Sequence, residues 1–237
     1  MPSAYYLESV EIGKRFQKEN SSWGGDDCKN YHNQTRVLMD KYDAKTVLDY
    51  GCGKGRQYTN LVPYGLPGDQ VTQPMTFQTR INAESVYKFD PCVQEFDTEP
   101  AGQTFDAVIC TQVLGSIPDI DMPWLRDKLM SYATKFVFIG LHNPVKQIKA
   151  KKRMYDYTQV TYPRSIEWYQ EQFAGWTGSD LYWWFRDTEH SVNNWYSMVF
   201  MLQEEQEQPQ VFREIHCQTL ETLLDLVFMA CISVQEM

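Results

Sequence analysis

A run of small and acidic residues between positions 47 and 55 has the chemistry of a ligand-binding loop. It reads Val-Leu-Asp-Tyr-Gly-Cys-Gly-Lys-Gly, so that Gly51, Gly53 and Gly55 alternate behind the acid Asp49. The apolar, β-branched start predicts a buried strand, and glycine at every second position predicts a turn in which the backbone approaches a ligand closely. We therefore predict a strand that leads directly into a ligand-binding loop.

The position of Asp49 distinguishes between two classes of cofactor for such a loop. A dinucleotide loop has the spacing Gly-x-Gly-x-x-Gly, in which N–H groups at a helix N-terminus bind a pyrophosphate. The glycine spacing here differs, and a carboxylate at Asp49 would repel a pyrophosphate. The same carboxylate suits a ligand that carries an ammonium or sulfonium charge, as the methionine half of S-adenosylmethionine does. The loop therefore favours S-adenosylmethionine over NAD.

The run resembles motif I of the class I, Rossmann-like S-adenosylmethionine-dependent methyltransferases, in which an acid precedes Gly-x-Gly-x-Gly. The resemblance covers roughly residues 45–202. It implies that the loop binds S-adenosylmethionine through Asp49, Gly51, Cys52, Gly53 and Gly55. Asp49 would hold the ammonium end of the cofactor, directly or through water.

Asp90 follows the apolar run Val86–Phe89, which predicts a second strand. An acid at this strand end can accept hydrogen bonds from both ribose hydroxyls, and the resemblance implies that role for Asp90. The alternative is a turn residue that ends the strand before Pro91.

A third strand is predicted over residues 104–110. The resemblance implies that Cys110, Thr111 and Gln112, at its end, flank the adenine and the sulfonium. Many relatives continue with Val-Leu-Glu-His after this strand, whereas the sequence here is Gln-Val-Leu-Gly-Ser. The acid and the histidine are both missing, so no catalytic role is carried over from that pair.

His142 follows the apolar run 135–141, at the edge where open parallel sheets bind ligands. A neutral imidazole there could accept a proton from the acceptor during methyl transfer. His142 is therefore the catalytic candidate, and a capping or structural histidine beside Pro144 is the alternative.

Strand and helix patterns alternate along the chain, which predicts an α/β fold. The resemblance implies a three-layer sandwich with a mostly parallel seven-stranded sheet that ends in an antiparallel hairpin, here residues 181–185 and 194–202. We expect an N-terminal helical cap over residues 1–44, a core over 45–202, and an acidic linker with a helix over 203–237. Within the core, a helix is expected over 54–61. In the cap, Trp23 and Tyr31 are candidates for a lid over the ligand or for ordinary packing.

Composition limits the partners. The net charge of -9 argues against a protein that coats nucleic acid, because such binding needs lysine and arginine to neutralise phosphates. The six cysteines form no CxxC pair, so no metal site is predicted. The N-terminus lacks a basic-then-apolar leader and no long apolar run occurs, so we expect a soluble, cytoplasmic protein.

We therefore predict an S-adenosylmethionine-dependent methyltransferase that transfers the methyl group in line to a small-molecule acceptor. Two alternatives stay open. The first is a nucleic-acid acceptor, favoured by the basic run 146–153 but opposed by the absence of the motif that amino-directed DNA methyltransferases share. The second is a non-catalytic protein that binds the cofactor or a partner.

Overall fold

A computed structural model of the chain describes residues 1–19, 24–62, 73–142, 164–173, 180–188 and 191–201. The chain divides into two compact units, Met1–Leu202 and Gln203–Met237, and every described residue belongs to the first. The basic run 146–153, Trp23 and the C-terminal segment 203–237 therefore lie outside the described residues.

One sheet, in the order β2-β1-β3-β4-β6-β5, organises the first unit. Its four parallel strands are β2, β1, β3 and β4; β6 is antiparallel to β4, and β5 is antiparallel to β6. The strands are β1 (Thr46–Tyr50), β2 (Ser85–Phe89), β3 (Phe105–Thr111), β4 (Ala133–His142), β5 (Asp180–Thr188) and β6 (Ser191–Met201). The predicted α/β fold with a parallel sheet is thus confirmed.

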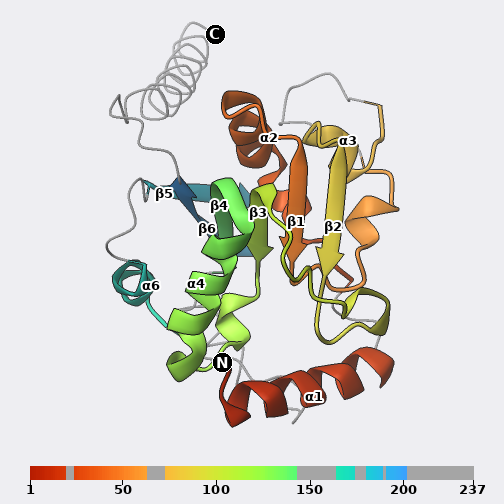
Figure 1. Cartoon of the computed structure of the whole chain (residues 1–237). Coiled ribbons are helices and arrows are strands. Elements are labelled where there is room, and N and C mark those ends of the chain that lie inside the picture. The colour runs from red at the N-terminus through yellow and green to blue at the C-terminus, as the bar shows by residue number, and fades with distance from the viewer. Residues whose placement is uncertain (20–23, 63–72, 143–163, 174–179, 189–190, 202–237) are drawn as a thin grey trace, which may run out of the picture. The chain divides into compact units, whose positions relative to one another are not determined.

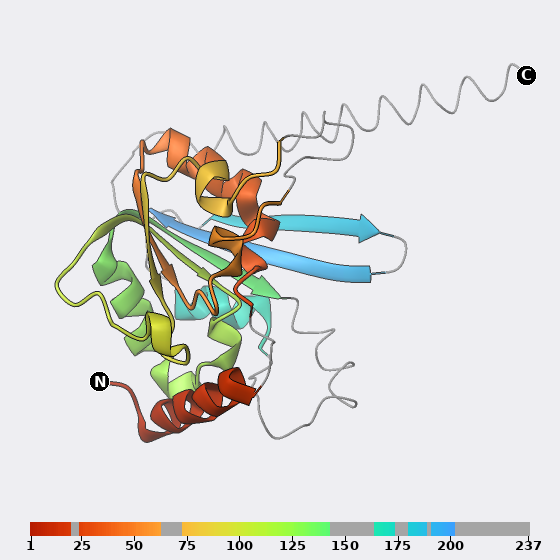
Figure 2. The ribbon, with the colours of Figure 1, turned by 90° about the vertical axis from the view of Figure 1, so that its right-hand side faces the viewer.

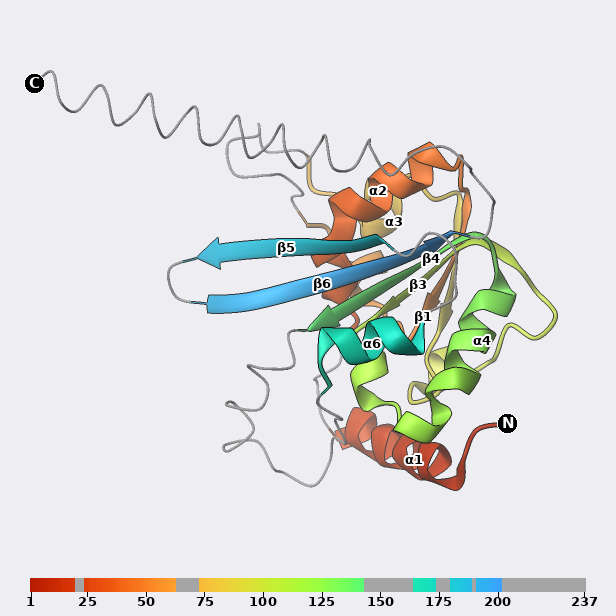
Figure 3. The same ribbon diagram turned by 90° about the vertical axis from the view of Figure 1, so that its left-hand side faces the viewer.

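Helices cover both faces of this sheet. Figures 2 and 3 show α2 (His32–Lys41) and α3 (Phe77–Arg80) on one face and α4 (Met122–Tyr132) and α6 (Ile166–Gln172) on the other. The remaining helix, α1 (Ala4–Glu19), lies beyond the ends toward which β1 and β2 point (Figure 1). Because parallel strands covered on both faces are shielded from water, β1 and β3 are almost wholly buried.

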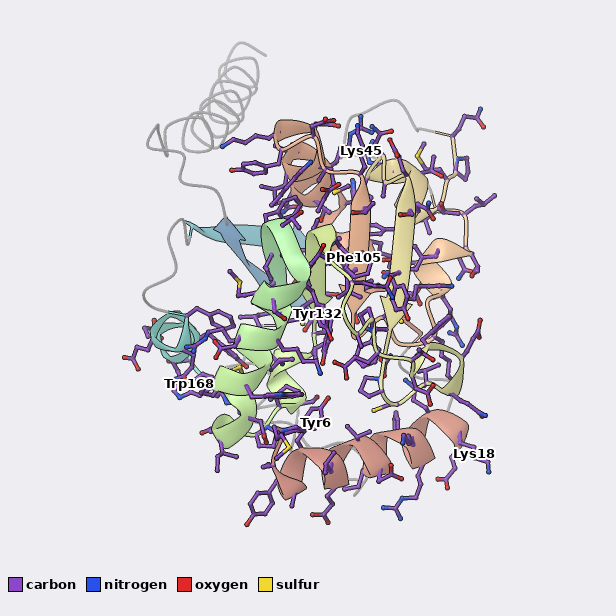
Figure 4. All side chains as sticks on the ribbon, in the orientation of Figure 1. Tyr6, Lys18, Lys45, Phe105, Tyr132 and Trp168 are labelled. Atoms are coloured by element: carbon purple, nitrogen blue, oxygen red, sulfur yellow. The ribbon has the colours of Figure 1, made fainter. Side chains whose placement is uncertain are left out.

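The main hydrophobic core lies between the sheet and α4. Leu125 and Leu129 of α4 are fully buried and belong to one core cluster with Val108 of β3 and Val137 of β4. Tyr6 of α1 joins the same core, and its ring meets that of Trp124 edge-on at 5.0 Å (Figure 4). The N-terminal helix is therefore packed into the domain by an aromatic contact.

Two sequence expectations are wrong. The sheet of the described residues has six strands and not seven, because the chain between β2 and β3 forms only the 3-10 turn Gln94–Phe96, flanked by Pro91 and Pro100. The helix expected over 54–61 is only a 3-10 turn, Arg56–Tyr58. Pro63 limits how far any helix could extend here, since the residue before a proline is driven toward an extended conformation, and Val62 pairs with Met75 in an isolated β-bridge.

Candidate functional site

The carboxyl ends of β1, β2 and β3 meet at one edge of the sheet. The register places Asp49 opposite Lys88 of β2 and Ile109 of β3. Just beyond the strands, the N–H groups of Gly51 and Cys52 both donate to the carbonyl oxygen of Phe89, at 2.7 and 3.1 Å. The glycine loop and the end of β2 are therefore neighbours.

The loop adopts a conformation that favours glycine. Gly51, Gly53 and Gly55 have φ angles of 88°, 55° and 61°, in the left-handed region. A Cβ atom on Gly51 would lie 2.0 Å from a methyl group of Val113, in the segment after β3. Gly51 is thus required both by its backbone angle and by the close approach of the neighbouring segment.

Asp90 braces this loop from the end of β2. One of its carboxylate oxygens accepts the N–H of Gly53 at 2.9 Å, and the other accepts the N–H of Cys92 at 2.8 Å. Burial raises the pKa of Asp90, and the two N–H donors act in the opposite direction. Because a carboxylate has about four acceptor positions, each oxygen keeps capacity for a further donor such as a hydroxyl group.

Asp49 is enclosed by its own chain and is only 1% exposed. Its Oδ2 accepts hydrogen bonds from the Gln57 amide and the Tyr58 hydroxyl, both at 2.8 Å. The thiol of Cys28 lies 3.8 Å from Oδ1. Burial raises the pKa of Asp49 to about 7, although these hydrogen bonds stabilise the ionised form. The carboxyl group therefore changes its protonation state near neutral pH.

A segment N-terminal to α2, Gly24–Tyr31, lies directly against the glycine loop. The N–H groups of Arg56 and Gln57 donate to the carbonyl oxygens of Gly24 and Gly25, at 2.9 and 3.1 Å. Gly25 has a φ of 72°, and a Cβ there would lie 1.9 Å from the carbonyl oxygen of Cys52. Backbone thus packs on backbone where the segment covers the loop.

The end of β3 supplies two polar residues to the same edge. The hydroxyl of Thr111 lies 3.3 Å from the Cys28 sulfur, and the Gln112 amide donates to the Tyr31 hydroxyl at 3.1 Å. Gln112 has a φ of 61°, and its N–H donates to the carbonyl oxygen of Gly140 in β4. The Gly24–Tyr31 segment is therefore bonded to β3 as well as to the glycine loop.

Most of the predicted site residues converge on this edge. Cys110 lies one residue earlier in β3 and is fully buried in the main core, whereas Cys52 is buried within the loop itself. His142 is the last residue of β4, paired with Trp195 of β6, so its backbone lies at the same edge; its side chain is outside the described part of the structure.

Three residues of the site were not predicted: Cys28, Gln57 and Tyr58. Gln57 and Tyr58 directly follow the glycine loop, but neither residue type signals a contact with a buried acid. Their contacts with Asp49 depend on the tight 3-10 turn at Arg56–Tyr58, where the sequence suggested a helix.

A second polar cluster lies after β3, around the turn Asp119–Asp121. The N–H and the hydroxyl of Ser3 each donate to the buried Asp121 carboxylate at 2.6 Å. Arg164, just before α6, donates to Asp119 and to the carbonyl oxygens of Leu114 and Ile117, and its guanidinium lies 4.4 Å from the ring centre of Trp168 (Figure 4). The turn thus attaches both α1 and α6 to the chain that follows β3.

Within the described ranges, no group of three or more His, Cys, Asp or Glu side chains could hold a metal ion. Across those same ranges, no helix has both the length and the apolar character needed to cross a membrane.

Comparison with models of protein families finds no match, and neither does comparison with curated protein sequences. Among solved structures, the chain is similar to the magnesium protoporphyrin IX methyltransferase of Synechocystis PCC 6803 with bound SAH, with 14% identity over 84% of this chain and 89% of that chain and a TM-score of 0.47. It is also similar to the plantazolicin methyltransferase BpumL in complex with SAH, with 9% identity over 84% and 97% of the two chains and a TM-score of 0.49.

A third similar structure is the O-methyltransferase TomG of Streptomyces achromogenes in complex with SAM, with 8% identity over 85% and 91% of the two chains and a TM-score of 0.42. These neighbours are methyltransferases.

Proposed function

We propose that the chain is a class I S-adenosylmethionine-dependent methyltransferase that acts on a small-molecule acceptor. One observation carries this proposal: Asp49 lies next to the last residue of β1, Asp90 directly follows the neighbouring parallel strand β2, and a loop of left-handed glycines lies beside them, bonded to Asp90. Backbone N–H groups, a buried acid and a second acid with remaining acceptor capacity suit a ligand that carries a cation at one end and a ribose at the other.

The residues present fit this cofactor. Asp90 would accept the ribose hydroxyls with the acceptor positions that Gly53 and Cys92 leave, and the glycine loop would contact the methionine half. Asp49 would act on the ammonium group through water, or directly once Gln57 or Tyr58 gives up its bond to Oδ2.

The end of β3 would form the adenine and sulfonium side, where Thr111 and Gln112 lie and Cys110 supports them from the core.

The chemistry that S-adenosylmethionine supplies is a methyl group on an already activated sulfonium leaving group. The task of the chain is then to align the acceptor for in-line transfer and to exclude water. We assign water exclusion to the cap of residues 1–44, which includes α1 and the Gly24–Tyr31 segment. The core of residues 45–202 would bind both ligands, and the segment 203–237 would be an appendage to it. His142, at the same strand edge, is the proposed base for acceptors that lose a proton.

Titration calorimetry with S-adenosylmethionine, S-adenosylhomocysteine and NAD tests this proposal. We expect micromolar binding of the two sulfur ligands and none of NAD. The Asp90→Asn variant should bind at least about tenfold more weakly, because ribose hydroxyls lose a charged acceptor. Asp127→Ala, which removes an exposed acid on α4, is the control and should bind like the wild type.

Binding of NAD alone, or of no ligand, would contradict the cofactor assignment. Binding without acceptor-dependent release of S-adenosylhomocysteine, across small molecules and oligonucleotides, would instead support a non-catalytic protein. Release with oligonucleotides alone would identify nucleic acid as the acceptor.

A further inference from the structure

Gln57 uses both ends of its side-chain amide, although it is only 2% exposed. Its Nε2 donates to Asp49 at 2.8 Å, and its Oε1 accepts the N–H of Cys28 at 3.1 Å. Since a backbone N–H can only donate, Oε1 must face Cys28, and this orientation of the amide turns Nε2 toward Asp49. Gln57 is therefore a fixed bridge between Asp49 and the Gly24–Tyr31 segment.

Tyr58 offers a natural comparison with Gln57. Its hydroxyl donates to the same oxygen of Asp49 at the same distance of 2.8 Å. Its ring, however, packs edge-on against Phe77 of α3, at 6.0 Å between ring centres. Two donors thus share one carboxylate oxygen, and Gln57 is the one that also bonds to the Gly24–Tyr31 segment.

The bridge matters because other side chains already contact both carboxylate oxygens of Asp49. A cofactor group that binds this carboxylate must displace Gln57 or Tyr58 from Oδ2, or displace the Cys28 thiol from Oδ1. Two of these three contacts involve Gln57 or the Gly24–Tyr31 segment. Access to Asp49 is therefore linked to the attachment of that segment.

We propose that Gln57 is a positioning residue that latches the Gly24–Tyr31 segment over Asp49, and that this latch sets how fast the cofactor enters and leaves. The inference rests on the proposed function for the identity of the ligand. The latch itself belongs to the free protein and can be tested without any ligand.

Amide hydrogen exchange on the free protein is the first test, with Gln57→Met compared with Tyr58→Phe. In Gln57→Met the Cys28 N–H loses its acceptor, so exchange across residues 24–31 should rise by about tenfold, the effect of one lost buried hydrogen bond on local opening. In Tyr58→Phe the same amides should exchange at the wild-type rate within about twofold. Equal exchange in the two variants would overturn the latch.

Stopped-flow binding of S-adenosylhomocysteine then separates latching from simple loss of affinity. Gln57→Met should raise both the association and the dissociation rate, since an unlatched segment opens more often. Tyr58→Phe should change the dissociation rate alone. If Gln57→Met changes only dissociation, Gln57 contributes to affinity but does not control access.

Thiol labelling of the wild type keeps the inference testable if Gln57→Met does not fold. Cys28 belongs to the segment and is 1% exposed, and Cys110 is fully buried in β3, so the two thiols report segment opening and global unfolding respectively. We expect an alkylating reagent to modify Cys28 at least about tenfold faster than Cys110, because local opening is more frequent than unfolding. Equal rates would show that the segment does not open on its own and would overturn the inference.

The two proposals fail in different ways. If the wild type binds no S-adenosylhomocysteine but Gln57→Met still loosens residues 24–31, the proposed function is wrong and the latch remains. If the ligand binds but exchange and labelling show no local opening, the function remains and the latch is wrong.

Discussion

Two turns at the same edge of the sheet differ in what their acidic side chains bind. At the first turn, the acids face inward: Asp90, after β2, accepts hydrogen bonds from the loop backbone, and Asp49, near the end of β1, is enclosed by Gln57, Tyr58 and Cys28. After β3, the acids of the turn Asp119–Asp121 bond outward, to Arg164 before α6 and to Ser3 before α1.

In the proposed function, the first turn holds the ligand, whereas the second turn holds the helices around it. The first turn consists of glycines packed against backbone, so an added side-chain atom is poorly tolerated there. Burying the charge of its carboxylates also costs free energy. The second turn is made of side-chain bonds to distant segments, so it can lose single bonds without losing its shape. Variants of the two turns should therefore differ in how much stability they lose and in how far from the substituted residue the structure loosens.

The largest effect is expected at Gly25, which covers the first turn. Gly25→Ala places a Cβ 1.9 Å from the Cys52 carbonyl oxygen at a left-handed backbone angle, and we expect a loss of about 4 kcal/mol of stability from overpacking and strain together. Urea unfolding measures it. Gly102→Ala is the matched control, because Gly102 has a φ of 73° and no atom within 4 Å of the added Cβ.

The control should lose only the backbone strain, about 1 kcal/mol. Equal losses of stability in Gly25→Ala and Gly102→Ala would show that the loop leaves room for a Cβ atom at Gly25.

The next effect comes from pH, through the buried carboxyl group of Asp49. Its pKa is raised by burial from an ordinary 3.8 to about 7 in the folded protein. Between these values the folded state keeps a proton that the unfolded state has lost. Stability therefore falls as pH rises from about 4 to about 7, on the order of 4 kcal/mol in all, and levels off above.

Asp49→Asn carries no charge at any pH, so it should remove this part of the slope and exceed the wild type in stability at pH 8, as measured by urea unfolding at several pH values. Asp90 also has a raised pKa and keeps a smaller slope of the same sign in the variant. Wild type and variant with parallel pH profiles would mean that Asp49 stays ionised throughout.

The first turn could be predicted from sequence because its parts are contiguous or follow strand ends. Asp49, the glycines and Asp90 each stand at a position that the strand pattern defines, and parallel pairing then brings those positions together. The polar partners of Asp49 could not be predicted. Cys28 reaches it across 21 positions of the sequence, and Gln57 reaches it only because the expected helix over 54–61 is a single 3-10 turn.

The second turn escaped prediction for a related reason. Residues 119–132 have the pattern of one helix, and α4 does occupy Met122–Tyr132, but Asp119–Asp121 form a separate 3-10 turn. The bonds from Asp119 to Arg164 and from Asp121 to Ser3 span 45 and 118 positions of the sequence. No local pattern encodes such pairs, because each partner is an ordinary surface residue type in its own segment.

The smallest effects are expected in this second turn, and they should differ between its two acids. Asp121→Ala removes a buried acceptor from the Ser3 N–H and hydroxyl, so we expect a loss of about 2 kcal/mol, typical of hydrogen bonds to a charged group. Asp119→Ala should cost under about 1 kcal/mol, because its side chain is 68% exposed and Arg164 keeps the carbonyl oxygens of Leu114 and Ile117.

The part of the chain that loosens distinguishes Asp121→Ala from Asp119→Ala more sharply than the loss of stability does. Asp121→Ala frees the start of α1, so hydrogen exchange in the first turn of that helix should rise, whereas Asp119→Ala should leave it protected. Tyr6 still packs on Trp124 in both variants, so α1 should loosen at its first turn without leaving the core. If both variants loosen α1 equally, the turn acts as one rigid unit and the two acids do not hold separate helices.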